Sequence, residues 1–281
     1  MKTKIFVSSS SGLDYISHAP TISVLPDRIV FSSVEEYDDY AELKAPEFYT
    51  RLKYDNEAKP KILAAQYDSI NKMIDNALKY KYDAFVVILN KFDDKYYDVI
   101  KKIIEKRPEI NLTIIGTSLL SYPLALGVIA ADKMIKAGKT YPEVEQMLAD
   151  RSDTFGIYFF SPDKDILPSI MKIEYDEDIE LSGTNANSYI ADQNGITLVK
   201  KNKKVYPYQQ LIRLFFDAIK NKETEPFILC TDEYSMYAKT MEKRLESEYP
   251  GKEIKKYYLT PEFGCQLGCN VVAVGYTEKL K

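Results

Sequence analysis

Apolar-rich runs and helical spacings alternate along the first half of the chain. Runs at residues 5–7, 84–89 and 112–115 have the length of buried strands. Apolar residues recur at helical spacing over residues 66–79, and residues 118–137 form a predicted helix that is apolar over most of its circumference. Such alternation is typical of a parallel sheet with helices on both faces. The pattern therefore predicts a three-layer α/β domain built on a parallel sheet.

The pattern changes near Asp153. Asn194-Gly195 lies between two short apolar runs, as in a two-residue hairpin turn. Helices are predicted at residues 208–220 and 233–248, and strands at 156–160, 227–230, 254–259 and 270–275. A hairpin combined with strand–helix units indicates a mixed sheet. We therefore predict two domains, a parallel α/β domain at residues 1–153 and a mixed-sheet α/β domain at residues 154–281.

Four consecutive serines, residues 8–11, end the first predicted strand, and Gly12 follows them. Open α/β sheets bind ligands beyond the carboxyl ends of their strands, where hydroxyls and backbone N–H groups can hold a carboxylate or phosphate. Ser10 and Ser11 are therefore candidate ligand-binding residues. Serine is also a favoured N-cap and turn residue, so a loop that caps the next helix is the alternative.

Composition narrows the classes of partner. The 281 residues carry a net charge of −4, which gives no reason to expect binding to nucleic acid or to an anionic membrane. The longest apolar tract, residues 119–131, is interrupted and too short to span a bilayer, so no membrane insertion is expected. No secretory signal is expected at the start of the chain. Three cysteines make no disulfide framework, which favours a reducing, cytoplasmic location.

Catalytic chemistry has few candidates. An enzyme needs a base or nucleophile oriented by a partner, and the single histidine, His18, lies in a predicted loop and is expected at the surface. A pair of His18 with one of the opening serines has no orienting motif. Asp93 and Asp94 fit general-base or metal-binding carboxylates, although carboxylates favoured by a helix N-terminus are commoner. We therefore predict a protein that is not an enzyme.

The cysteines also raise the question of a metal. Cys265 and Cys269 are flanked by glycines, a spacing that suggests a metal or redox pair. Only Cys230 is left over, and there is no histidine cluster, so a closed zinc site lacks ligands. We expect no metal and no cofactor.

Several local motifs along the chain resemble one protein family. They are the opening KIFVSSSSGLD, Pro46-Glu47-Phe48-Tyr49 followed by Leu52, Tyr82-Asp83 before a buried strand, Ala137-Gly138-Lys139 after a long helix, and GCQLGCN at residues 264–270. On these residues the chain is similar to the DegV family, of which it looks like a divergent member. The family's bacterial members include fatty-acid-binding proteins that present lipid to a fatty acid kinase.

The resemblance implies a fold, a ligand and a partner. The fold is a three-layer parallel domain followed by a mixed-sheet domain, with an acyl chain in a buried cavity below the inter-domain cleft. The ligand is a fatty acid or related lipid, and the partner is the catalytic subunit of a fatty acid kinase. The family's carboxylate-binding residues are mostly altered: Ile62 stands at a hydroxyl position, Asp93 at a serine with Asp94 beside it, and Gln266 at a histidine.

Two hypotheses follow from the altered residues. The first is a lipid-binding protein whose site includes Ser10, Ser11, Ile62, Asp93, Asp94 and Gln266. The second is a small-molecule enzyme or sensor that kept the fold and changed the cleft. An ionised Asp93 would repel a fatty carboxylate, so we expect weak binding of ordinary fatty acids at neutral pH, or a ligand that bears a hydroxyl, amide or cation.

Overall fold

The computed structural model describes residues 2–55, 58–161, 187–198, 207–220 and 224–279. The chain divides into two compact units. Unit 1 comprises Met1–Lys44 and Ala58–Asp150, and unit 2 comprises Ala45–Glu57 and Arg151–Lys281. The two units are described separately below.

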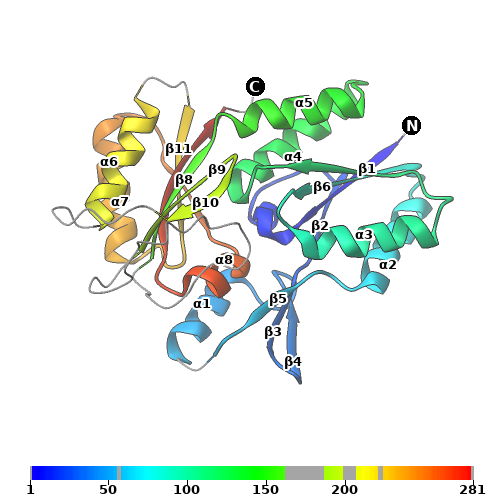
Figure 1. Cartoon of the computed structure of the whole chain (residues 1–281), viewed down its shortest axis with the longest axis horizontal. Helices are drawn as coiled ribbons and strands as arrows, with labels where there is room; N and C mark the ends of the chain where they lie inside the picture. The colour runs from blue at the N-terminus through cyan, green and yellow to red at the C-terminus, as the bar shows by residue number, and fades with distance from the viewer. Residues whose placement is uncertain (1, 56–57, 162–186, 199–206, 221–223, 280–281) are drawn as a thin grey trace. The chain divides into compact units, whose positions relative to one another are not determined.

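A four-stranded parallel sheet forms the centre of unit 1, in the order β2-β1-β6-β7 (Figure 1). Its strands are β1 (Thr3–Ser8), β2 (Ile22–Leu25), β6 (Ala84–Asn90) and β7 (Leu112–Thr117). All seven residues of β6 are buried, as its unbroken apolar sequence predicts for a central strand. Because the strands are parallel, all four carboxyl ends lie at the same edge of the sheet.

Helices cover both faces of this sheet. α2 (Tyr67–Lys79) and α3 (Asp94–Lys106) pack on one face, against Phe6, Phe85 and Val87. α4 (Ser121–Lys136) packs against β1 from the other face. The first eight residues of α4 are all buried.

α5 (Tyr141–Ser152), which the sequence analysis did not predict, covers part of α4. Gly127 of α4 lies so close to Leu148 of α5 that an added Cβ would be 2.9 Å from its Cδ2. α4 is apolar over most of its circumference in part because it packs against α5 as well as against the sheet.

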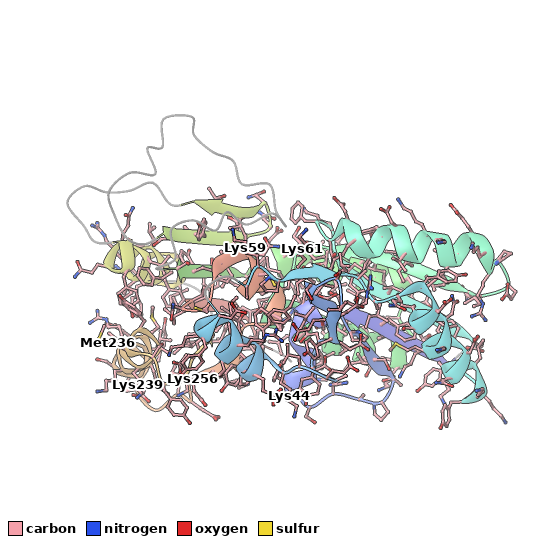
Figure 2. The ribbon with its side chains drawn as sticks, turned by 90° about the horizontal axis from the view of Figure 1, so that it is seen from below. Lys44, Lys59, Lys61, Met236, Lys239 and Lys256 are labelled. Atoms are coloured by element: carbon pink, nitrogen blue, oxygen red, sulfur yellow. The ribbon has the colours of Figure 1, made fainter. Side chains whose placement is uncertain are left out.

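A small antiparallel sheet belongs to unit 1, in the order β4-β3-β5. It comprises β3 (Arg28–Ser32), β4 (Glu35–Asp38) and β5 (Lys61–Leu63). The exposed Lys59 and Lys61 flank the start of β5 (Figure 2). β4 has the acidic sequence EEYD, which does not by itself predict a strand. Pairing with β3 places Glu36 Oε1 2.8 Å from Arg28 Nη1, an ion pair that the sequence does not predict.

Unit 2 is built on a six-stranded mixed sheet in the order β10-β9-β8-β13-β11-β12. Its strands are β8 (Gly156–Ser161), β9 (Asn187–Asp192), β10 (Gly195–Leu198), β11 (Thr224–Cys230), β12 (Lys255–Tyr258) and β13 (Val272–Glu278). β9 and β10 form the hairpin predicted at Asn194-Gly195. α6 (Pro207–Ile219) and α7 (Met236–Glu248) share a core cluster with the sheet, and Met236 and Lys239 point outward from α7 (Figure 2).

Two further helices of unit 2 pack on each other. α1 (Ala45–Tyr54) contacts α8 (Pro261–Leu267), and the Tyr49 hydroxyl donates to the Thr260 carbonyl oxygen at 2.9 Å. An added Cβ at Gly264 would lie 2.5 Å from the rings of both Phe48 and Tyr49. The absence of a side chain at this glycine is what allows the close contact.

The prediction of a parallel three-layer fold followed by a mixed-sheet fold is confirmed. The division into residues 1–153 and 154–281 stays a prediction about domains, and the compact units differ from it because Ala45–Glu57 belongs to unit 2. The GCQLGCN motif at residues 264–270, for which no helix is predicted, begins inside α8. Pro261 at the first turn favours this helix.

Candidate functional site

The serine loop at the carboxyl end of β1 is compact and buried. Residues Ser9–Ser11 form a short 3-10 helix, and Gly12 reverses the chain with a φ of 69°. The hydroxyl oxygens of Ser8 and Ser10 are 2.6 Å apart. Ser11 donates its hydroxyl to the Ser8 carbonyl oxygen at 2.8 Å and accepts from the Leu13 amide at 3.3 Å. The loop therefore has a fixed shape, and Ser11 helps to hold it.

A buried charged cluster lies beside this loop. The Ser9 hydroxyl accepts a hydrogen bond from the Asp27 amide at 3.1 Å. The Asp27 side chain is fully buried, and Asp93 is 5% exposed. The ammonium of Lys95 lies 3.0 Å from Asp93 Oδ1 and 3.8 Å from Asp27 Oδ2. Two carboxylates and one ammonium therefore meet at the carboxyl end of the sheet, which we call the Asp27–Lys95–Asp93 cluster.

Tyr96 lies against this cluster. Its buried hydroxyl donates to the Leu25 carbonyl oxygen at 3.1 Å and accepts from the Ala65 amide at 3.3 Å. Burial, followed by the charge of Asp27, raises the pKa of Tyr96 well above its usual value. Tyr96 therefore stays protonated and ties the segment after β5 to the end of β2.

The end of β6 is tied to the loop that precedes α4. Asn90 donates through Nδ2 to the Leu119 carbonyl oxygen at 2.9 Å and accepts from the Phe92 amide at 2.8 Å. α4 then begins at Ser121, a buried residue with a φ of 49°. The N-terminus of this helix carries partial positive charge. Since α4 also packs against Ser9–Ser11, a polar or anionic group at the serine loop would lie near that charge.

The predicted site residues of unit 1 separate into two groups. Ser10 and Asp93 are both buried, and they lie on two loops that Asp27 and Lys95 connect. Asp94 is exposed at the first turn of α3, where the helix dipole favours a carboxylate. Ile62 is half-buried on β5, opposite Ile29 of β3. None of these placements tests binding, so the assigned roles stay predictions.

The remaining predicted site residue lies in unit 2. Gln266 is half-buried in α8. Cys265 is its neighbour in that helix, and Cys269 follows the helix end; both are half-buried, whereas Cys230 is buried in β11. Within the part of the chain that the structure describes, no group of three or more His, Cys, Asp or Glu side chains could hold a metal ion. No described helix is long and apolar enough to cross a membrane.

Sequence reasoning missed Asp27, Asn90 and Tyr96. Asp27 follows Pro26, and an aspartate there suggests a turn residue. Tyr96 lies in an apolar pattern typical of the buried face of a helix, but its hydroxyl contacts Leu25 and Ala65, which are distant in the sequence. The one available signal was the position of Asp27 and Asn90 at the ends of predicted strands, where parallel sheets place their functional groups.

Solved structures of other proteins share this fold along the whole chain. A fatty acid binding DegV family protein from Streptococcus agalactiae has a TM-score of 0.80 at 17% identity, with 100% of both chains covered. A fatty acid (stearic acid)-binding protein from Eubacterium ventriosum has a TM-score of 0.77 at 14% identity, covering 99% of this chain and 98% of that one. A DegV family protein from Eubacterium eligens, loaded with heptadecanoic acid, has a TM-score of 0.72 at 12% identity, covering 99% and 100%. The fold is therefore that of a class of proteins that includes fatty acid binders.

Sequence comparison gives the family itself. A family model described as "Uncharacterised protein, DegV family" matches residues 2–167. A DegV domain-containing protein of Clostridium perfringens is 25% identical over 139 residues, which are 49% of this chain and 48% of that protein. The chain thus spans about half the length of this curated relative. The chain belongs to the DegV family, which confirms the resemblance inferred from its motifs.

Proposed function

We propose that this protein binds a fatty acid or a related lipid and does not catalyse a reaction on it. Family membership supports the proposal, together with the fatty acids named for structures of the same fold. The observation that carries it in this chain is the buried serine loop beside the N-terminus of α4. In our proposal the polar headgroup lies at this end of the sheet, with the hydroxyls of Ser8 and Ser10 as hydrogen-bonding groups.

Calorimetric titration of delipidated protein with oleate tests this proposal. Ser10→Ala should weaken binding by about two- to tenfold, the value of one hydrogen bond. Ser33→Ala, at an exposed serine of the same unit, is the matched control and should bind as the wild type does. Failure of the wild type to bind oleate, oleyl alcohol and oleamide alike would contradict lipid binding. Equal affinities for the two variants would place the headgroup elsewhere.

The headgroup we propose is one with a hydroxyl or amide. The Asp27–Lys95–Asp93 cluster holds two carboxylates for one ammonium, so with all three ionised its net charge is −1. Repulsion between that charge and a fatty carboxylate at about 4 Å is on the order of 4 kcal/mol if the effective dielectric constant is near 20. Oleyl alcohol and oleamide should therefore bind more tightly than oleate at pH 7.5. The reverse order would refute the proposed headgroup while leaving lipid binding intact.

The altered family positions can be tested together. Asp93→Ser, Ile62→Thr and Gln266→His restore the residue types that the family uses, and the triple variant should bind oleate more tightly than the wild type. Asp98→Ser, at an exposed carboxylate of α3 outside the predicted site, is a control that should change little. An unchanged affinity in the triple variant would show that these positions do not hold the headgroup.

A role in presenting the lipid to a fatty acid kinase rests on the family resemblance alone. We propose that a purified bacterial fatty acid kinase catalytic subunit phosphorylates a fatty acid bound to this chain. Absence of acyl phosphate product, with a known lipid-presenting partner active in the same assay, would contradict that role.

A small-molecule sensor is the second candidate function, because the charged cluster would suit a ligand with a cation or several hydroxyls. Stabilisation against heat by a water-soluble ligand without an acyl chain, with no effect of any lipid, would favour it over lipid binding.

A further inference from the structure

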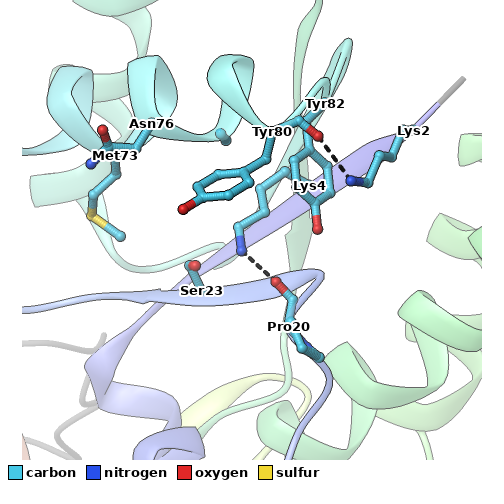
Figure 3. A pocket seen from close by; sticks show the side chains of 9 residues that line it. Lys2, Lys4, Pro20, Ser23, Met73, Asn76, Tyr80 and Tyr82 are labelled. Carbon is cyan, nitrogen blue, oxygen red and sulfur yellow. Dashed lines mark hydrogen bonds between the residues drawn. The ribbon is translucent and has the colours of Figure 1, made fainter.

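A pocket lies toward the amino ends of the strands of the parallel sheet, away from the serine loop. Its volume is about 430 Å³, which is within the range of small-molecule sites. The pocket lies between the amino ends of β1 and β2 and the carboxyl end of α2 (Figure 3). Lys4, one of its lining residues, precedes Ser8 by four residues of β1, roughly 13 Å at 3.3 Å per residue. All of its lining residues belong to unit 1.

Two lysines place positive charge in this pocket. The ammonium groups of Lys2 and Lys4 lie 4.2 Å and 5.4 Å from the centre of the Tyr82 ring. Lys2 donates to the Tyr80 carbonyl oxygen at 2.9 Å, and Lys4 donates to the Pro20 carbonyl oxygen at 2.6 Å. Both ammonium groups therefore have a carbonyl partner beside the same aromatic ring, Lys2 from an exposed position and Lys4 from a half-buried one.

The charges around the pocket leave room for an anion. Among the described lining residues there are two lysines and no carboxylate. The nearest acidic groups have other contacts: Asp132 accepts from Thr21 at 2.5 Å and from Lys136 at 2.6 Å, and Asp83 accepts from the Lys2 amide at 2.6 Å. Burial lowers the pKa of Lys4; the negative charge of Asp132 raises it, and the positive charge of Lys2 lowers it further. A bound anion would relieve both the burial of the Lys4 charge and its repulsion by Lys2.

The rest of the lining is mostly apolar and aromatic. Figure 3 shows Lys4 passing the ring of Tyr80 toward Pro20, with Met73 on the α2 side. Tyr80 is 72% exposed, although a tyrosine ring is among the side chains that gain most from being covered. Tyr82 and Met73 add further surface suited to a flat ring.

We propose that this pocket binds a small organic anion, a carboxylate or phosphate carried on a flat apolar body. The anion lies between the ammonium groups of Lys2 and Lys4, and the flat body covers Tyr80. This site is separate from the proposed lipid headgroup site and does not depend on it.

A single-tryptophan variant reports on this pocket alone. The chain contains no tryptophan, so Tyr80→Trp places the only one at the pocket. We expect a saturable change in tryptophan fluorescence with phenyl phosphate and with benzoate. Benzyl alcohol, which lacks the charge, and inorganic phosphate, which lacks the ring, should each bind at least about tenfold more weakly. Oleate should neither produce the change nor compete with phenyl phosphate.

Lysine variants in the Tyr80→Trp background complete the test. Lys2→Gln together with Lys4→Gln should weaken phenyl phosphate binding at least about tenfold. Lys72→Gln with Lys101→Gln removes the same charge from exposed positions of α2 and α3 and should bind as the parent does. If the first pair disturbs folding, Lys2→Gln alone, at an exposed residue, should still weaken binding several-fold.

Four results would overturn the proposal. They are the absence of any saturable change with both aromatic anions, equal losses in the two lysine pairs, equal affinity for inorganic phosphate, and displacement of phenyl phosphate by oleate. The last would assign the pocket to the lipid site. Failure of oleate, oleyl alcohol and oleamide to bind anywhere would contradict the proposed function and leave this site unaffected.

Discussion

Replacing Lys95 by methionine tests whether the Asp27–Lys95–Asp93 cluster is held together by its ammonium. The change keeps the length and helix propensity of the side chain and removes its charge. At 3.0 Å and 3.8 Å, and with an effective dielectric constant near 20, the two attractions are about 5 and about 4 kcal/mol. The cost of burying the ammonium offsets much of this sum, and removing one partner of a buried ion pair typically costs about 3–5 kcal/mol. Since Lys95 is 21% exposed, we expect a loss near the lower value, about 3 kcal/mol.

Urea unfolding followed by circular dichroism measures this loss. For a slope of about 2–3 kcal/mol per molar urea, the midpoint of unit 1 should fall by roughly 1 M. Lys101→Met, at an exposed position of the same helix, is the control and should move the midpoint little.

A double variant makes the reasoning refutable. Adding Asp93→Asn to Lys95→Met removes one of the two carboxylates and should recover a substantial part of the stability. Asparagine is also acceptable at this N-cap position, so the helix start should not suffer. A loss in Lys95→Met no larger than in Lys101→Met, or a further loss in the double variant, would show that Lys95 does not stabilise the cluster.

Three further results are expected. Burial raises the pKa of Asp14 to about 6, against the opposing effect of His18, so the folded state favours the protonated carboxyl group and becomes less stable as pH rises from about 4 through 6. Asp14→Asn should therefore add about 1–2 kcal/mol to the free energy of unfolding at pH 7 and nothing at pH 4, measured by urea unfolding; an equal gain at both pH values would contradict this. Burial raises the pKa of Cys230 to about 12, so a thiol reagent at pH 8 should label at most two cysteines in the native protein and three after unfolding; three fast thiols would be inconsistent with the fold. Gly264→Ala should destabilise unit 2 by about 1–3 kcal/mol, because its methyl group would overlap two rings, and Phe48→Leu in the same chain should return part of that loss; a neutral Gly264→Ala would refute the close contact.

The parts of the fold that were predictable are those in which the local pattern matches the final environment. β6 is apolar throughout and buried throughout, and the Asn-Gly turn fits only a tight hairpin. β5 was missed because its three residues alternate in exposure over too short a length, and their strand conformation depends on pairing with β3. α8 was missed because glycines do not favour a helix. In the structure, the lack of a side chain at Gly264 makes room for the rings of Phe48 and Tyr49 in α1.

The candidate site divides in the same way. The serine loop was visible because polar residues abruptly end an apolar run. The partner of Asp93 was not, because Asp27 lies 66 residues earlier in the chain and reaches it only through Lys95. No local pattern contains a contact of that separation, so charged clusters assembled from distant loops require the structure.

The assignment of α1 to unit 2 has a consequence for how the protein is made. The hydroxyl of Tyr49 bonds to a carbonyl 211 residues further along the chain. On the ribosome, the parallel sheet of unit 1 can form as soon as β7 has emerged, while Phe48 and Tyr49 must wait until Thr260 and α8 are synthesised. During that interval the rings of Phe48 and Tyr49 lie in a segment between the two parts of unit 1, and α8, which will cover them, does not yet exist. Contacts of such separation close slowly, and exposed apolar groups invite association between chains. The segment around α1 is therefore where a nascent copy of this protein would most benefit from a chaperone.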